Sequence, residues 1–240
     1  MSQQTNIAKF TSVVNSTCSN LSFTVPFKNG DHKFKVMSVA QHQKLIANTN
    51  KSYKEMKEFR KVLYSIMKEN TLDGIVNLTG LDQTDFYLFL YWNRYYSLSK
   101  TFNNIEMVFN SNFQRFNEDL NVSFENFKLE CSMPSIETIL WAESQFRESD
   151  EESEGKLIVG IYTSELIKYI NVVHVGDDYV NLSGATYEER QKLLGVLPAQ
   201  LIRQLSEKLT KYSQYIEDNF FFTLGEEKIT LPTNVDFYSV

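Results

Sequence analysis

The sequence predicts an α+β fold, mostly helical with several β-hairpins, in a single compact domain that carries an acidic surface loop. Its 240 residues fit one large domain or two small ones. Hydrophobic residues make up 42% and aromatic residues 14%, enough apolar material for a real core. Apolar residues recur at helical spacing in the longer segments and at period two in the shorter ones. The pattern shows no repeat of fixed period and no regular strand–helix alternation, so a doubly wound fold is not expected.

The first elements are an arm and a hairpin. Residues 1–20 are polar without a clear period, and we expect a loosely held arm there. Two short runs with partial alternation follow, Leu21–Val25 and Lys33–Met37. Between them lie Asn29 and Gly30, which tolerate positive φ and suit a tight turn. These features predict a β-hairpin.

Three helices are predicted next. Ser38 can cap a helix that starts at Val39. A second helix is expected over residues 52–69, where apolar residues share one face. The third runs over residues 82–99 and starts with Asp82 as its N-cap. It is apolar on nearly every face, which is typical of a central helix.

The middle of the chain contains two predicted strands and an acidic run. The strands are Ile105–Phe109 and Leu120–Leu129, and a short helix follows Ser135. Five of the eight residues in 148–155 are acidic and none is apolar, so this segment predicts a solvated, flexible loop.

The acidic loop separates the part of the chain before it from the part after it. We expect residues 21–240 to form one domain, with two lobes over 21–147 and 156–240 as the alternative organisation.

The C-terminal third predicts helices between two further hairpins. Thr186 and Glu189 form a Thr-x-x-Glu capping box at the start of one helix, and Pro198 suits the first turn of the next. The predicted segments are a helix over 163–170, a hairpin of 172–175 with 179–182, helices from 187 to about 195 and from 198 to about 218, and a hairpin of 220–224 with 228–231.

Composition excludes several classes of function. The formal net charge is −6, which argues against a nucleic-acid binder because such a surface must neutralise phosphates. The 9 glycines form no phosphate-binding loop. The longest strongly apolar run, residues 86–92, is far short of the ~20 residues that span a bilayer. The N-terminus does not resemble a secretory signal, so we expect a soluble, intracellular protein.

The residues able to support catalysis are few and scattered. Cys18 and Cys131 predict free thiols rather than a disulfide framework. His32, His42 and His174 show no metal-ligand spacing. We therefore expect no cofactor, no metal site and no enzymatic activity. A thiolate–imidazole pair of Cys131 and His174 remains the alternative for an enzyme.

The densest feature of the sequence is aromatic. Tyr, Trp and Arg dominate the energetics of protein interfaces, so the set in the third helix predicts a binding surface, or else the packing of an interior helix. A triple Phe run places apolar groups on both faces of a strand and requires cover from the domain or from a partner. The candidate interaction residues are Tyr91, Trp92, Arg94, Tyr95, Tyr96, Phe220, Phe221 and Phe222.

Three segments together resemble the baseplate hub protein family of T-even-like contractile-tailed bacteriophages. They are FTVPFKNGDHKFKVMSVAQHQKLI, NLTGLDQTDFYLFLYWNRYYSLS and ELIKYINVVHVGDDYVNLSGATYEERQKLLGVLPAQLIRQL. Arg94 and Ser97 stand where that family has an Arg-x-x-Ser-like segment, and the resemblance covers about residues 21–110 and 162–217. The chain departs from the family in its acidic insertion and in lacking the Cys-x-x-Cys pair that many members carry after the central helix.

The resemblance implies a non-catalytic structural or chaperone-like assembly protein of the phage tail baseplate hub. Its implied partners are other hub and tail proteins, with homo-oligomerisation as a further expectation. It implies no nucleic-acid partner and no membrane span. The implied location is the host cytoplasm during assembly, or the virion if the protein stays in the tail. Two alternatives stay open: a phage-encoded adaptor that binds a host protein through its acidic loop, and an unfamiliar Cys-dependent enzyme.

Overall fold

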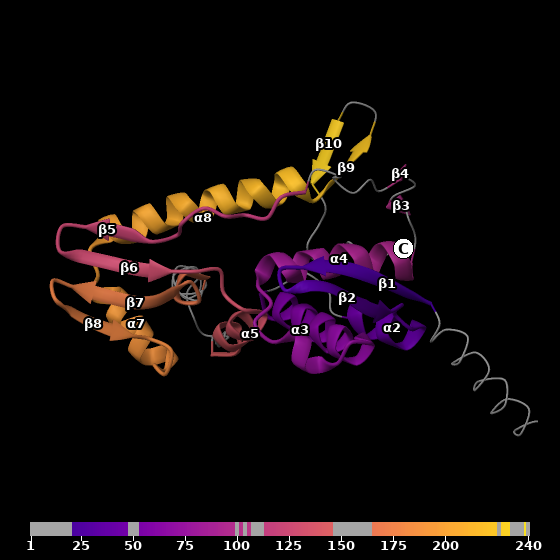
Figure 1. The fold of residues 1–240 in the computed structure, drawn as a ribbon, viewed down its shortest axis with the longest axis horizontal. Coiled ribbons are helices and arrows are strands. Elements are labelled where there is room, and N and C mark those ends of the chain that lie inside the picture. Colours follow the sequence, from indigo (N-terminus) through magenta and orange to yellow (C-terminus); the bar gives the residue numbers. More distant parts are fainter. Residues whose placement is uncertain are drawn as a thin grey trace, which may run out of the picture. The chain divides into compact units, whose positions relative to one another are not determined.

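The protein has an α+β fold with antiparallel sheets (Figure 1). A computed structural model describes residues 21–47, 53–98, 101–102, 105–106, 113–145, 165–224, 227–230 and 238. The arm predicted over 1–20 and the acidic loop 148–155 lie outside the described residues.

The chain divides into two compact units. Unit 1 comprises Met1–Leu81, Asp85–Phe109 and Phe222–Val240, and unit 2 comprises Asp82–Thr84 and Asn110–Phe221. These boundaries differ from the predicted lobes 21–147 and 156–240. The physical reason is that strands on either side of the acidic run pair with each other, which places both flanks of that run in unit 2.

Unit 1 begins with the predicted hairpin. Strand β1 (Ser22–Phe27) pairs antiparallel with β2 (Gly30–Lys35). Gly30 has a φ of 122°, a conformation that favours glycine at this turn. Alternate side chains of β1, starting with Phe23, point into the core of the unit.

The helices of unit 1 lie close to their predicted positions. Ser38 caps the first through its side chain, and Gln41 completes a capping box. The elements are α2 (Val39–Ile46), α3 (Tyr53–Asn70), the 3-10 helix η1 (Ile75–Leu78) and α4 (Gln83–Ser97). Short strand pairs are formed by β3 (Thr101–Phe102) with β4 (Ile105–Glu106), and by β9 (Phe221–Leu224) with β10 (Glu227–Thr230). Of the predicted strand 105–109, only β4 lies within the described residues.

Aromatic packing joins the hairpin of unit 1 to α4. The ring centroids of Phe34 and Phe89 are 4.9 Å apart, and those of Phe23 and Phe34 are 5.8 Å apart. Helix α3 adds Phe59 and Leu63, both fully buried. Burying these apolar side chains removes them from water and supplies the main stabilisation of the unit.

Unit 2 contains a four-stranded antiparallel sheet in the order β5-β6-β7-β8 (Figure 1). Its strands are β5 (Val122–Phe124), β6 (Phe127–Cys131), β7 (Ile170–Val175) and β8 (Asp178–Asn181). The prediction of one strand over 120–129 was wrong, because Glu125 takes a positive φ of 52° and the chain turns back there. Phe124 and Phe127 pair with each other on the two sides of this hairpin turn.

Three helices accompany this sheet: α5 (Ile136–Gln145), α7 (Tyr187–Val196) and α8 (Ala199–Asn219). Leu201 and Leu205 of α8 share one buried cluster with Leu129 and Val173 of the sheet. The helix predicted over 163–170 is too long at its end, since only residues 165–167 of its described part are helical. Ile170 already pairs with Cys131 in the sheet.

Candidate protein-binding surfaces

Part of the predicted aromatic surface is interior to unit 1. Tyr91 and Arg94 on α4 are each only 2% exposed. Burial raises the pKa of the Tyr91 hydroxyl and lowers the pKa of the Arg94 guanidinium. Side chains this buried pack inside their own unit and present little surface to a partner.

The other three α4 residues of the predicted set, Trp92, Tyr95 and Tyr96, form a ring cluster that reaches the surface. Tyr96 is 45% exposed and stacks on Phe23 of β1, with centroids 5.4 Å apart and planes 6° from parallel. It also stacks on Trp92 at 5.4 Å and meets Tyr95 edge-on at 5.1 Å. Tyr96 is therefore the member of the predicted set that is best placed to contact a partner.

The predicted Phe run belongs to a different part of the fold. Phe220, in unit 2, is buried and meets Phe113 edge-on at 5.9 Å. Phe221 is half-buried, and the side chain of Phe222 lies outside the described residues. Phe220 thus takes its cover from its own unit.

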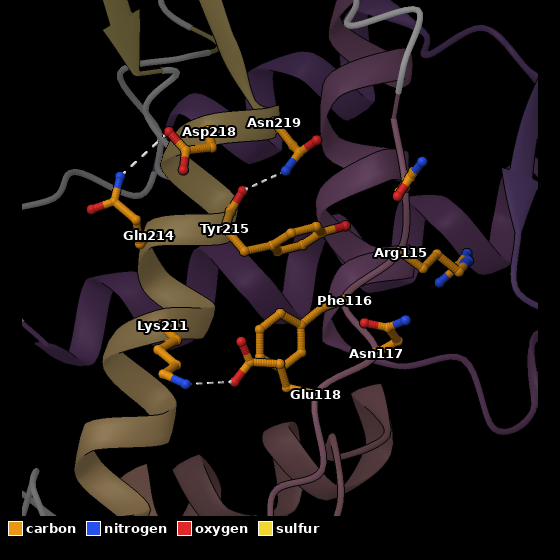
Figure 2. A pocket seen from close by; sticks show the side chains of 10 residues that line it. Arg115, Phe116, Asn117, Glu118, Lys211, Gln214, Tyr215, Asp218 and Asn219 are labelled. Carbon is orange, nitrogen blue, oxygen red and sulfur yellow. Dashed lines mark hydrogen bonds and ion pairs between the residues drawn. The ribbon is translucent and has the colours of Figure 1, made fainter.

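A polar groove of about 480 Å³ lies in unit 2 between α8 and residues 114–118 (Figure 2). The rings of Phe116 and Tyr215 lie 5.4 Å apart within it. Lys211 Nζ is 3.1 Å from Glu118 Oε2, so charges of both signs line the groove. Such a lining suits hydrogen bonding to a polar segment. No sequence pattern over residues 110–119 pointed to this groove.

The edge of the four-stranded sheet in unit 2 carries exposed apolar side chains. In the strand order of the described sheet, β8 has β7 on one side and an open edge on the other. All four residues of β8 are exposed, including Tyr179 at 69% and Val180 at 54%. An edge strand presents unpaired backbone N–H and C=O groups that can pair with another chain.

A charged cluster adjoins this edge on one face of the sheet. Lys128 Nζ lies 2.9 Å from Glu130 Oε1, and His174 Nε2 lies 3.1 Å from the same oxygen. The hydrogen bond from Lys128, with a smaller contribution from His174, holds the pKa of the Glu130 carboxyl below its ordinary value. The ring of Tyr179 lies 5.8 Å from that of His174, so the cluster extends to the open edge.

The alternative Cys131–His174 pair is not formed in the described structure. Cys131 of β6 pairs with Ile170 of β7. His174 of β7 pairs instead with Lys128, which lies three residues before Cys131 on β6. Positions an odd number of residues apart on a strand point to opposite faces. Burial also raises the pKa of the Cys131 thiol to about 12, so the thiol is protonated near neutral pH.

The described residues lack two features, a metal-ligand group and a membrane-spanning helix. Among the residues that the structure describes, His, Cys, Asp and Glu form no group of three or more that could hold a metal ion. Within the same residues, no helix combines the length and apolar character needed to cross a bilayer.

A comparison of this chain with protein-family models, with curated proteins and with solved structures finds no match in any of the three.

Proposed function

We propose that this protein is a non-catalytic structural or assembly component of the phage tail baseplate hub, acting by binding other proteins of the tail. The sequence resemblance to the hub family supports a role in assembly of the baseplate hub. The proposal places the protein in the host cytoplasm during assembly, with other hub or tail proteins, and further copies of itself, as partners.

The observation that carries the binding role is the open edge of β8. A partner strand laid along it would gain main-chain hydrogen bonds, which give affinity. Tyr179 and Val180 add apolar and aromatic area to the same strand. Lys128, Glu130 and His174 supply a polar rim beside them. An apolar centre within a polar rim is the usual composition of a protein interface.

The experiment is co-expression with the neighbouring tail genes followed by affinity capture. The wild-type chain should retain at least one tail protein, and Val180→Lys should weaken that capture by about tenfold or more, because charge on an edge strand opposes pairing. Val196→Lys is the matched control, since Val196 is 76% exposed on α7 of the same unit and is not part of the sheet.

Two outcomes would contradict the proposal. Failure of the wild-type chain to capture any tail protein removes the assembly role. Equal capture by Val180→Lys and Val196→Lys removes the β8 edge as the binding surface. Specific capture of a host protein that is lost at moderate salt would instead favour the adaptor alternative, because screening weakens exposed charge pairs.

A further inference from the structure

Tyr238 is an enclosed aromatic residue whose hydrogen-bond partners come from distant parts of the chain. Its side chain is fully buried in unit 1. The α4 residues that bind its hydroxyl lie 145 and 148 positions earlier in the sequence. Tyr238 is therefore held by residues of α2, α3 and α4, all far from it in the sequence.

The hydroxyl of Tyr238 meets both a hydrogen-bond acceptor and a donor. Its Oη donates to the carbonyl oxygen of Leu90 at 2.8 Å and accepts from Nδ2 of Asn93 at 3.2 Å. Oδ1 of Asn93 accepts from the hydroxyl of Ser97 at 3.1 Å, and that hydroxyl oxygen accepts from the backbone N–H of Met37 at 2.8 Å. This chain of bonds holds the Asn93 amide with its N–H groups toward Tyr238.

Helices α2 and α3 contact the backbone and the ring of Tyr238. Nε2 of His42, on α2, lies 2.9 Å from the backbone carbonyl oxygen of Tyr238. A carbonyl only accepts hydrogen bonds, so Nε2 is the donor and carries the hydrogen. The ring of Phe59, on α3, lies 6.0 Å from the Tyr238 ring at an angle of 59°. Ring, hydroxyl and backbone are thus each contacted by a different helix.

The chemistry of these contacts favours tyrosine over phenylalanine. Burial raises the pKa of the Tyr238 hydroxyl, so it stays protonated and can donate to Leu90. A phenylalanine would leave the Leu90 carbonyl and the Asn93 amide without this partner in a buried place. A site built to hydrogen-bond a hydroxyl rejects an analogue that lacks it for this reason.

We propose that His42, Phe59, Leu90 and Asn93 form a peptide-binding socket selective for tyrosine, filled in cis by Tyr238 and able to accept the same segment from a second copy. Seven residues, 231–237, separate Tyr238 from the end of β10, so the connection between them is short in sequence. Exchange of an identical segment between copies is a low-cost route to association. The short connection gives the cis segment a high effective concentration, so trans binding competes only when the cis tyrosine is removed or copies are crowded. The socket does not depend on the baseplate role or on the β8 edge.

The test uses the full chain carrying Tyr238→Ala and a fluorescently labelled peptide of residues 231–240, LPTNVDFYSV. Fluorescence anisotropy should show saturable binding to the variant. A peptide with Tyr238→Phe should bind about tenfold or more weakly, because it lacks the hydrogen-bonding hydroxyl. The wild-type chain should also bind the tyrosine peptide at least about tenfold more weakly, because its own segment fills the socket.

A second measurement, the thermal midpoint, keeps the test decisive if Tyr238→Ala loses part of its folded structure. The tyrosine peptide should raise the thermal midpoint of Tyr238→Ala in a concentration-dependent way, and the phenylalanine peptide should raise it less. Equal binding of the tyrosine and phenylalanine peptides would overturn the proposal. So would equal binding of the peptide by wild type and variant, or a variant that neither binds the tyrosine peptide nor gains thermal stability from it.

Discussion

Arg190 shows how one side chain can join several elements of unit 2. Its Nη1 donates to the carbonyl oxygens of Ile167 at 3.2 Å and Ile170 at 3.4 Å, and its Nη2 donates to that of Leu182. Its guanidinium carbon lies 4.9 Å from the centre of the Trp141 ring. Burial lowers the pKa of Arg190. Only a planar, many-donor group can make these contacts together.

Arg190→Lys should therefore lower the free energy of unfolding by about 1–3 kcal/mol, because an ammonium cannot reach all three carbonyl oxygens and hydrogen bonds in a partly buried place are lost. Urea denaturation checks this value. Arg203→Lys is the control, since Arg203 is exposed and pairs with Glu207 at 3.0 Å within α8. A control effect as large as that of Arg190→Lys would show that the carbonyl contacts are not the cause.

Cys131 allows a prediction about reactivity. Burial raises the pKa of its thiol to about 12, so near pH 8 very little thiolate is present. In a Cys18→Ser background, Cys131 should react with a disulfide reagent at least about a hundredfold more slowly in the folded protein than in urea, because its thiolate fraction and its access are both restored on unfolding. Equal rates with and without urea would contradict the buried position.

At the level of the helices, capping boxes connect sequence to structure most directly. The Thr186 hydroxyl accepts from the backbone N–H of Glu189 at 3.3 Å, and the Glu189 carboxylate accepts from the backbone N–H of Thr186 at 2.8 Å. The hydrogen bonding of the Glu189 carboxylate to Thr186, the backbone N–H above all, holds the pKa of Glu189 below its ordinary value. Both groups satisfy backbone donors that the start of α7 would otherwise leave unpaired.

Thr186→Ala should lower the free energy of unfolding by about 1 kcal/mol, the usual cost of losing such a cap. Chemical denaturation measures it. Thr210→Ala is the matched control, because Thr210 is exposed within α8 and its hydroxyl bonds only to the Ser206 carbonyl among the described partners. A stable Thr186→Ala variant alongside an equally stable control would show that the cap is dispensable.

A hydrogen-bonded carboxylate links α2 to α3 and makes stability depend on pH. Glu69 accepts from Gln41 at 2.9 Å and from Ser65 at 2.9 Å, and these bonds lower the pKa of Glu69 from its ordinary 4.5. A depressed pKa contributes stability above the unfolded-state value, and this contribution disappears as the pH falls through the folded-state value.

Glu69→Gln should therefore destabilise the protein at pH 7, and its difference from wild type should shrink between pH 7 and pH 3, because the stabilising contribution of the carboxylate is lost as the pH falls through its folded-state pKa. Denaturation midpoints at both pH values check the sign. Glu207→Gln, which removes an exposed carboxylate paired with Arg203, should have an effect of less than about 0.5 kcal/mol at pH 7. A Glu69→Gln difference that stays constant or grows at low pH would contradict the assignment.

Across the full chain, the two units each have an apolar core. Leu63 is fully buried in unit 1, and Leu205 is fully buried in unit 2. Replacing either by alanine should lower the free energy of unfolding by about 2–5 kcal/mol, through lost burial and a residual cavity.

Hydrogen exchange read by mass spectrometry should separate these two variants. Leu63→Ala should speed exchange mainly in peptides of α3 and α4, and Leu205→Ala mainly in peptides of α8 and β5–β7, because local opening follows the contacts of each core. Equal acceleration throughout the chain by both variants would show that the units open together.

Local signals predicted much of the fold. The hairpin predicted at Asn29 and Gly30, the Ser38 cap and the Thr186 capping box all depend on residues within a few positions of one another. Each is confirmed, although the two residues of the hairpin turn are Lys28 and Asn29 and Gly30 already pairs in the sheet. The error over residues 120–129 also has a local cause. Glu125 adopts a positive φ that non-glycine residues seldom take, so this turn of Glu125 and Asn126 lacks the glycine that usually marks such a conformation.

The amino-acid order was enough for element types, helix starts and the α+β class, because caps, turns and periodicity are short-range properties. Folding decided which aromatic residues are interior, since Tyr91 and Tyr96 lie on one helix and differ only in what packs against them. It also decided that β8 is the outer strand of the described sheet and that Tyr238 is buried against α4. These features depend on pairings between segments many positions apart, and hydrophobic burial is non-directional, so no short window of sequence specifies them.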